Sequence, residues 1–164
     1  MKKLFFIPAL ALLASCAGNH EQAETSADSM NNMNMPADHT QNEKVKIAIQ
    51  PVKPGQEVYF ENLKDGDVVK SPLLVKFGVK GMTVEPAGVI TEDKGHHHLI
   101  IDGTFVEEGY AVPMSDVSIH YGKGQLEDTI NLTPGKHTLT MQFANGSHVS
   151  YGEAMSKTIT VEVK

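Results

Sequence analysis

The sequence contains no tryptophan, only four tyrosines and a single cysteine among its 164 residues. One cysteine excludes a disulfide within the chain, so packing of the core must hold the folded part together. The shortage of aromatic side chains leaves little material for a groove that stacks against sugars. The 14 basic residues are outnumbered by 20 acidic ones. This balance argues against nucleic acid or anionic lipid headgroups as partners.

Sequence motifs of the common enzyme classes are also missing. The chain has no G-x-S-x-G, no H-E-x-x-H and no glycine-rich loop between a strand and a helix. A metal-dependent hydrolase would need an open coordination position and a general base, a role that Glu92, Asp93 or Asp102 could fill. The sequence therefore favours a protein that binds its ligand without turnover, with such a hydrolase as the less favoured alternative.

No apolar run reaches the ~20 residues that a membrane-spanning helix requires. The N-terminus, MKKLFFIPALALLASC, instead combines two lysines, a short apolar segment and small residues before Cys16. This pattern predicts a lipoprotein signal peptide over residues 1–15. The last four residues resemble a lipobox, so we expect cleavage before Cys16 and its lipidation. Such an anchor would hold the protein at a membrane of the cell envelope, facing the periplasm or the cell exterior.

Residues 16–43 begin with the lipidated cysteine and continue with a stretch that has no aliphatic β-branched residue. We expect a flexible tether, because such a composition cannot bury enough apolar surface to fold. Methionines are ordinary in unfolded tails, but thioethers and an imidazole also form a soft ligand set that suits Cu(I). That set consists of Met30, Met33, Met35 and His39.

Residues 44–164 have the usual length of one domain, and their short apolar runs end at turn residues such as Asp65-Gly66 and Asn145-Gly146. Apolar residues occupy every second position in residues 73–79, 139–143 and 159–163. No stretch sustains helical spacing. The pattern predicts an all-β fold, a single immunoglobulin-like antiparallel β-sandwich behind the disordered tether.

Three consecutive histidines lie between Gly95 and the apolar run 99–101. On a strand, His96 and His98 would share one face with Asp102, while His97 would share the other face with Leu99 and Ile101. Two imidazoles at positions i and i+2 are close enough to share Zn²⁺ or Cu²⁺. The alternative is that one face of the triplet packs and the other is solvated, with each ring nitrogen bonded to backbone or water.

Three further histidines follow the triplet at spacings too long for a local metal motif. If the fold brings His120 or His148 beside the triplet, copper or zinc could be bound by three or four ligands. Asp102 or Glu92 could then serve as a carboxylate ligand or support one. His137 alternates with Leu139 and Met141, which predicts a half-buried histidine that bonds to backbone.

The segments FGVKGM, PAG, GHHHLIID, HYGKGQ and PGKHTL occur in this order between residues 77 and 139. With them the chain resembles domain-of-unknown-function family 4399 over about Val58 to Val163. The resemblance implies a small domain exported behind a signal peptide or lipid anchor, and it brings no established activity. The family pattern has a further histidine and paired prolines after the His148 position, where this chain reads SHVSYGEAMS.

These observations predict a cell-envelope lipoprotein whose β-sandwich binds a transition metal through histidines. The alternatives are a metal-free module that binds an envelope component or carbohydrate, and the metal-dependent hydrolase. The expected partners are the membrane, through the anchor, and a metal ion or envelope component. Nucleic acid is not expected.

The anchor can be tested directly in cells. Cys16→Ser removes the acylated thiol, so we expect the variant to remain unprocessed or to leave the membrane fraction, whereas the wild type partitions with membranes. Fractionation and mass spectrometry of the N-terminus measure both effects. An unlipidated, freely soluble wild-type protein would refute the anchor.

Overall fold

The computed structural model describes residues 45–164. The predicted signal peptide, Cys16, the tether over residues 16–43 and its methionine-rich set lie outside the described residues. Among residues 45–164 there is no helix with the length and apolar character that crossing a membrane would require.

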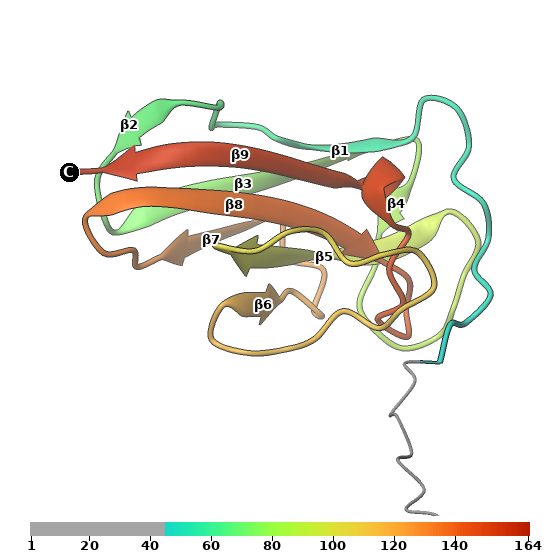
Figure 1. Ribbon diagram of the computed structural model, residues 1–164. Helices are drawn as coiled ribbons and strands as arrows, with labels where there is room; N and C mark the ends of the chain where they lie inside the picture. The colour runs from blue at the N-terminus through green and yellow to red at the C-terminus, as the bar shows by residue number, and fades with distance from the viewer. Residues whose placement is uncertain (1–44) are drawn as a thin grey trace, which may run out of the picture. The chain divides into compact units, whose positions relative to one another are not determined.

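Two packed β-sheets make up the described domain (Figure 1). The small sheet has the order β1-β3-β7, with β1 at Glu57–Phe60, β3 at Leu73–Lys80 and β7 at Glu127–Ile130. The large sheet has the order β2-β9-β8-β5-β4, and β6 also pairs with β5. Its strands are β2 (Asp67–Val69), β4 (Thr83–Val84), β5 (Lys94–Ile101), β6 (Ser118–His120), β8 (Gly135–Ala144) and β9 (Ser156–Val163). The helical structure of residues 45–164 is limited to one short 3-10 turn, Glu153–Met155, so the predicted all-β sandwich is confirmed.

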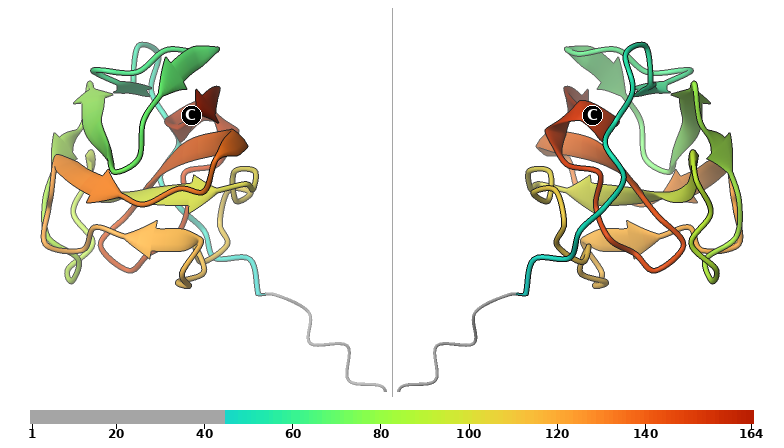
Figure 2. Two further views of the ribbon diagram at one scale, coloured as in Figure 1. Left: turned by 90° about the vertical axis from the view of Figure 1, so that its left-hand side faces the viewer. Right: turned by 90° about the vertical axis from the view of Figure 1, so that its right-hand side faces the viewer.

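Two short strand pairs depart from the antiparallel pattern. β2 pairs in parallel with β9, at the end of the molecule seen in the left view of Figure 2, and β4 pairs in parallel with β5. Parallel neighbours cannot be joined by a tight hairpin. The β4–β5 connection, residues 85–93, is accordingly long. It returns the chain so that β5 begins beside the first residue of β4.

The core lies between the sheets and uses the faces that the alternation predicted. Val75 and Phe77 of β3 face Leu139 and Phe143 of β8, and these side chains are almost completely buried. Burying each such side chain contributes roughly 1.5–3 kcal/mol. The polar faces of β8 and β9 lie on the outside of the large sheet, where the loop after β5 covers part of β8 through contacts of Gly103 with Thr140 and of Val106 with Gln142.

His97 belongs to this core, as its predicted face requires. Its ring is completely buried, with the Phe77 ring centroid at 5.4 Å and the Phe143 centroid at 5.0 Å. Neither ring nitrogen has a hydrogen-bond partner within the described residues. The imidazole therefore acts as a flat packing element between the two sheets.

This packing predicts different effects for two substitutions. His97→Ala should lower the free energy of unfolding by about 2–4 kcal/mol, because it leaves a cavity between two aromatic rings. His97→Leu keeps most of the volume and removes two buried nitrogens that make no hydrogen bond, so it should cost less than about 1 kcal/mol. Chemical denaturation of metal-free protein measures both. Equal losses would show that the His97 nitrogens make an essential polar contact.

Candidate metal centre

β5 fixes two of the predicted ligand side chains on the outer face of the large sheet. It pairs with β8 along one edge and with β4 and β6 along the other. The backbone of the histidine triplet is therefore held from both sides. His96 and His98 point away from His97, as predicted, and both are completely buried.

β6 brings in the third imidazole. His120 is the register partner of His98 on the neighbouring strand, and directly opposed residues carry their side chains on the same face of a sheet. The Nε2 atom of His96 lies 3.1 Å from Nε2 of His98 and 3.2 Å from Nε2 of His120.

The turn after β8 brings in the fourth. His148 donates its backbone N–H to the Asn145 carbonyl, and the Asn145 side chain accepts the N–H groups of Ser147 and Val149. His148 has a positive φ of 66°, which is uncommon for a residue other than glycine. The turn directs its Nε2 atom to within 3.1 Å of Nε2 of His120. We call His96, His98, His120 and His148 the histidine cluster.

The spacing of the cluster is difficult to explain by hydrogen bonds alone. A neutral imidazole Nε2 carries either one proton or one lone pair, so it takes part in one normal hydrogen bond. The four Nε2 atoms form three successive contacts of 3.1, 3.2 and 3.1 Å, and only two of these can be hydrogen bonds at once. Nitrogens held tetrahedrally at about 2.0–2.1 Å from one ion are roughly 3.3 Å apart. The spacing is therefore close to that of metal ligands.

Three members of the cluster form the tightest group. The candidate ligand atoms of His96, His98 and His120 all lie within 4.8 Å of one another. His148 contacts His120 but stands farther from His98, with ring centroids 6.1 Å apart. This geometry describes a three-histidine face with a fourth imidazole beside it.

The local environment favours the neutral form of His96, His98 and His120. Burial lowers the pKa of His96 to about 4 and that of His98 to about 2, with neighbouring histidines contributing. Burial, and then His148, also lowers the pKa of His120. Nδ1 of His96 and of His98 is buried without a hydrogen-bond partner in residues 45–164. No hydrogen bond within the described residues therefore prevents Nδ1 from carrying the proton, and in that tautomer Nε2 has the free lone pair that a metal ligand needs.

Two glycine-containing segments that the sequence reasoning missed help to position the cluster. A Cβ atom built on Gly122 would lie 2.1 Å from Cε1 and 2.3 Å from Nε2 of His120, so the ring occupies space that only glycine leaves free. In the loop before β5, Ala87 donates its N–H to Gly122, and Gly88 donates its N–H to Gly146. The only available signal was the presence of HYGKGQ and PAG among the segments that carry the family resemblance.

Asp102 is not part of the cluster, and its predicted role is corrected here. It follows the far end of β5, about 13 Å along the strand from His98 at ~3.3 Å per residue, and has a positive φ of 55°. Its carboxylate accepts bonds from His137 Nδ1 at 2.8 Å and from the Thr138 N–H at 3.0 Å. Alternation gave Asp102 the face of His96 and His98 but could not show that the strand ends at Ile101.

His137 confirms the expectation of a half-buried histidine bonded to backbone. Nε2 lies 2.9 Å from the Thr133 carbonyl, while Nδ1 faces Asp102. Both nitrogens therefore face acceptors, and the bond to Asp102 is the main cause of the raised pKa of His137. Because Nε2 donates its proton to the Thr133 carbonyl, this nitrogen has no lone pair to accept a proton from the Thr133 hydroxyl, which lies 3.3 Å away.

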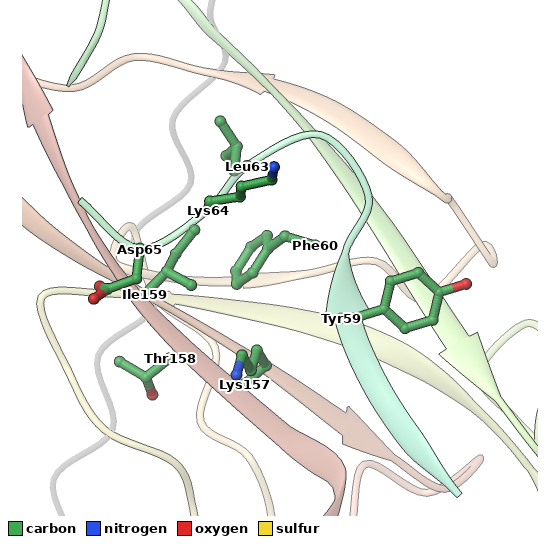
Figure 3. A pocket seen from close by; sticks show the side chains of 8 residues that line it. All are labelled: Tyr59, Phe60, Leu63, Lys64, Asp65, Lys157, Thr158 and Ile159. Carbon is green, nitrogen blue, oxygen red and sulfur yellow. The ribbon is translucent and has the colours of Figure 1, made fainter. Parts of the chain in front are cut away.

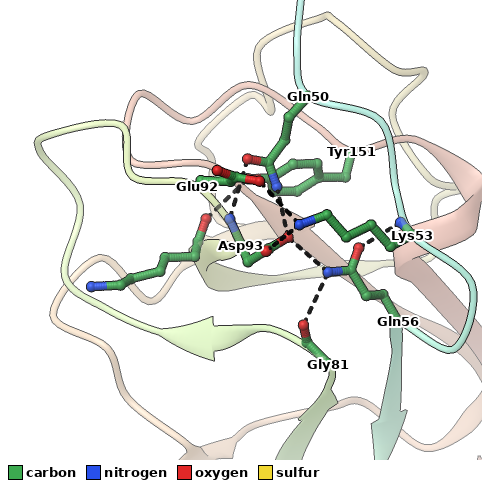
Figure 4. Close-up of polar contacts among 8 residues, drawn as sticks. Gln50, Lys53, Gln56, Gly81, Glu92, Asp93 and Tyr151 are labelled. Atoms are coloured by element: carbon green, nitrogen blue, oxygen red, sulfur yellow. Dashed lines mark hydrogen bonds and ion pairs between the residues drawn. The ribbon is translucent and has the colours of Figure 1, made fainter.

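Glu92 and Asp93 are also engaged elsewhere. Both pair with Lys53, and the Asp93 carboxylate accepts further bonds from Gln56 at 2.9 Å and Gln50 at 3.2 Å (Figure 4). The bond from Lys53 is the main cause of the lowered pKa of Asp93. These contacts tie residues 50–56 to the start of β5, so the two acidic residues anchor the histidine strand and do not join the cluster.

The buried histidines predict a loss of stability in mild acid. The unfolded chain, with histidine pKa values of about 6.5, takes up protons that the folded chain accepts only near pH 4 for His96 and near pH 3 for His97. Stability should therefore fall as pH drops below 6.5. The melting temperature of metal-free protein should fall by at least about 5 °C between pH 7 and pH 5.

His97→Leu should reduce this slope, because one of the depressed groups is gone. The His137–Asp102 pair acts in the opposite direction, since the raised pKa of His137 makes its contribution fade above pH 6.5. That pair is partly exposed and should contribute little. A melting temperature that stays constant from pH 7 to pH 5 would contradict this account.

A comparison with protein families matches residues 75–164, more than half of the chain, to the family model described as "Domain of unknown function (DUF4399)". The matched range contains the whole histidine cluster. No curated protein and no solved structure matches the chain.

Proposed function

We propose a metal-binding function for this chain, which belongs to the DUF4399 family of domains of unknown function. We infer that it is an envelope lipoprotein whose β-sandwich binds a transition metal through His96, His98 and His120, with His148 as the fourth ligand. The observation that carries the proposal is the run of three Nε2 contacts of 3.1–3.2 Å.

The donor set limits the choice of ion. Imidazoles suit Zn²⁺ and copper, whereas Mg²⁺ and Ca²⁺ require oxygen ligands. Among the described residues, the group that could hold an ion contains histidines without a carboxylate. Three clustered imidazoles with a fourth beside them favour Zn²⁺, and Cu²⁺ would bind more tightly wherever the geometry can relax.

Binding without turnover is the better supported form of this function. A hydrolytic centre needs a general base beside the metal-bound water. The three acidic residues considered for that role lie outside the cluster and are engaged with Lys53 or His137. Nothing in the described residues favours the hydrolase.

The proposal can be tested by calorimetric titration of the untagged protein with Zn²⁺ and Cu²⁺. We expect one ion per chain, and His96→Ala, His98→Ala or His120→Ala should each weaken binding at least tenfold. His137→Ala is the matched control, because it removes an imidazole that lies outside the cluster. Wild-type binding weaker than about 100 μM, or an equal loss in the control, would refute the assignment.

Gly122→Ala tests the geometry without removing a ligand. The added methyl group would collide with the His120 ring, and because that ring is a side chain, it can swing away while the backbone stays folded. We expect metal binding to weaken at least tenfold. Gly124→Ala is the control in the same turn: it strains a backbone with φ of 78°, but its nearest atoms are 3.7 Å away, so affinity should be kept. Unchanged binding in Gly122→Ala would mean that His120 is not a ligand.

A further inference from the structure

A pocket of about 390 Å³ opens where β1 of the small sheet lies beside β9 of the large sheet (Figure 3). It is lined by both strands and by the connection from β1 to β2. In the large sheet, β8 separates β9 from the strand that carries the histidine triplet. The volume is within the range of small-molecule sites, roughly 300–1,000 Å³.

The floor of this pocket is apolar. Phe60, Leu63 and Ile159 are at most 8% exposed and belong to the core. Figure 3 shows the Phe60 ring lying between the side chains of Lys64 and Lys157. A ligand that enters the pocket would therefore meet an apolar surface with an ammonium group on either side.

The polar groups of the pocket divide into engaged acceptors and available donors. Asp65 accepts the Thr160 N–H at 2.8 Å, and the Thr158 hydroxyl lies 2.9 Å from that of Thr140. Lys64 and Lys157 also line the pocket. Within residues 45–164 their side chains form no ion pair or hydrogen bond, and an ammonium group can only donate. The pocket therefore presents donors that lack acceptors.

The wall that carries Lys64 is held in place before any ligand arrives. The Asn62 side chain donates to the Leu74 carbonyl at 2.9 Å and accepts the Lys76 N–H at 2.8 Å. The Lys64 N–H donates to the Asp67 carboxylate at 2.9 Å. A preformed wall reduces the ordering cost of binding.

We propose that this pocket binds a small organic anion, with its apolar body over Phe60 and its oxyanion head within reach of Lys64 and Lys157. The lining carries the two ammonium groups and the Asp65 carboxylate, so positive charge exceeds negative charge there on a chain whose formal charge is −6. Charge-assisted bonds to an oxyanion are the strong pairing available to such groups. A carboxylate and a phosphate share this chemistry.

The test uses the full-length protein and the fluorescent probe 8-anilino-1-naphthalenesulfonate, an aromatic body with one sulfonate. We expect saturable fluorescence enhancement at one site, which decanoate or decyl phosphate displaces. Decanol, with the same chain and no charge, should displace the probe at least tenfold less effectively. The more effective of the two anions identifies the preferred head group.

Variants connect the binding to this pocket. Lys64→Gln/Lys157→Gln should weaken probe binding at least tenfold, while Lys123→Gln/Lys136→Gln, two exposed lysines outside the pocket, should leave it within twofold. Circular dichroism and melting temperature verify that both variants fold. Non-saturable binding, equal displacement by decanol, or equal losses in the two double variants would overturn the proposal. Because no metal takes part, the result is independent of the histidine cluster.

Discussion

A strand that is buried on both faces must accommodate every polar side chain it carries, and β5 carries three imidazoles in succession. Its backbone is paired on both edges, so none of these rings can turn to solvent without breaking a sheet. The rings can be buried because they are neutral at physiological pH, an outcome of the same burial that lowers their pKa values. The two faces use that neutrality differently: the inner ring packs between phenylalanines, and the outer rings face other imidazoles.

The loops around β5 are arranged about its outer face, which carries His96 and His98. β6, the turn after β8 and the loop before β5 all converge on it. The positive φ of His148 is the strained feature of that convergence, and the missing side chain of Gly122 leaves the space that the His120 ring occupies. A bound ion would convert crowded lone pairs into coordinate bonds. Since the site exists only in the folded chain, the ion would also stabilise the fold, by about 2.7 kcal/mol at a free concentration 100 times Kd.

The parts of this site that were predictable from the sequence depend on local backbone geometry. The two-residue repeat of a strand was enough to separate His96 and His98 from His97, because it needs no knowledge of the partner strands. His120 and His148 could be proposed by residue type, but their convergence depends on the β5–β6 register and on a turn built by Asn145. Asp102 was misassigned because a shared face was taken to mean proximity, although a spacing of four strand residues already puts it about 13 Å from His98. The two parallel pairs at the sheet edges likewise depend on tertiary packing, which no local pattern encodes.

The family match separates the two proposed sites. Residues 75–164 contain every member of the histidine cluster, together with Gly122 and the loop that supports it. The pocket is built largely from Tyr59, Phe60, Leu63, Lys64 and Asp65, which precede that range, and only its β9 wall lies inside it. The cluster therefore lies entirely within the segment that matches the family, and a metal site there would be expected wherever the same histidines recur. The pocket needs the preceding strand and its connection to β2, so a chain that shared only the matched segment would keep the cluster and lack most of the anion site.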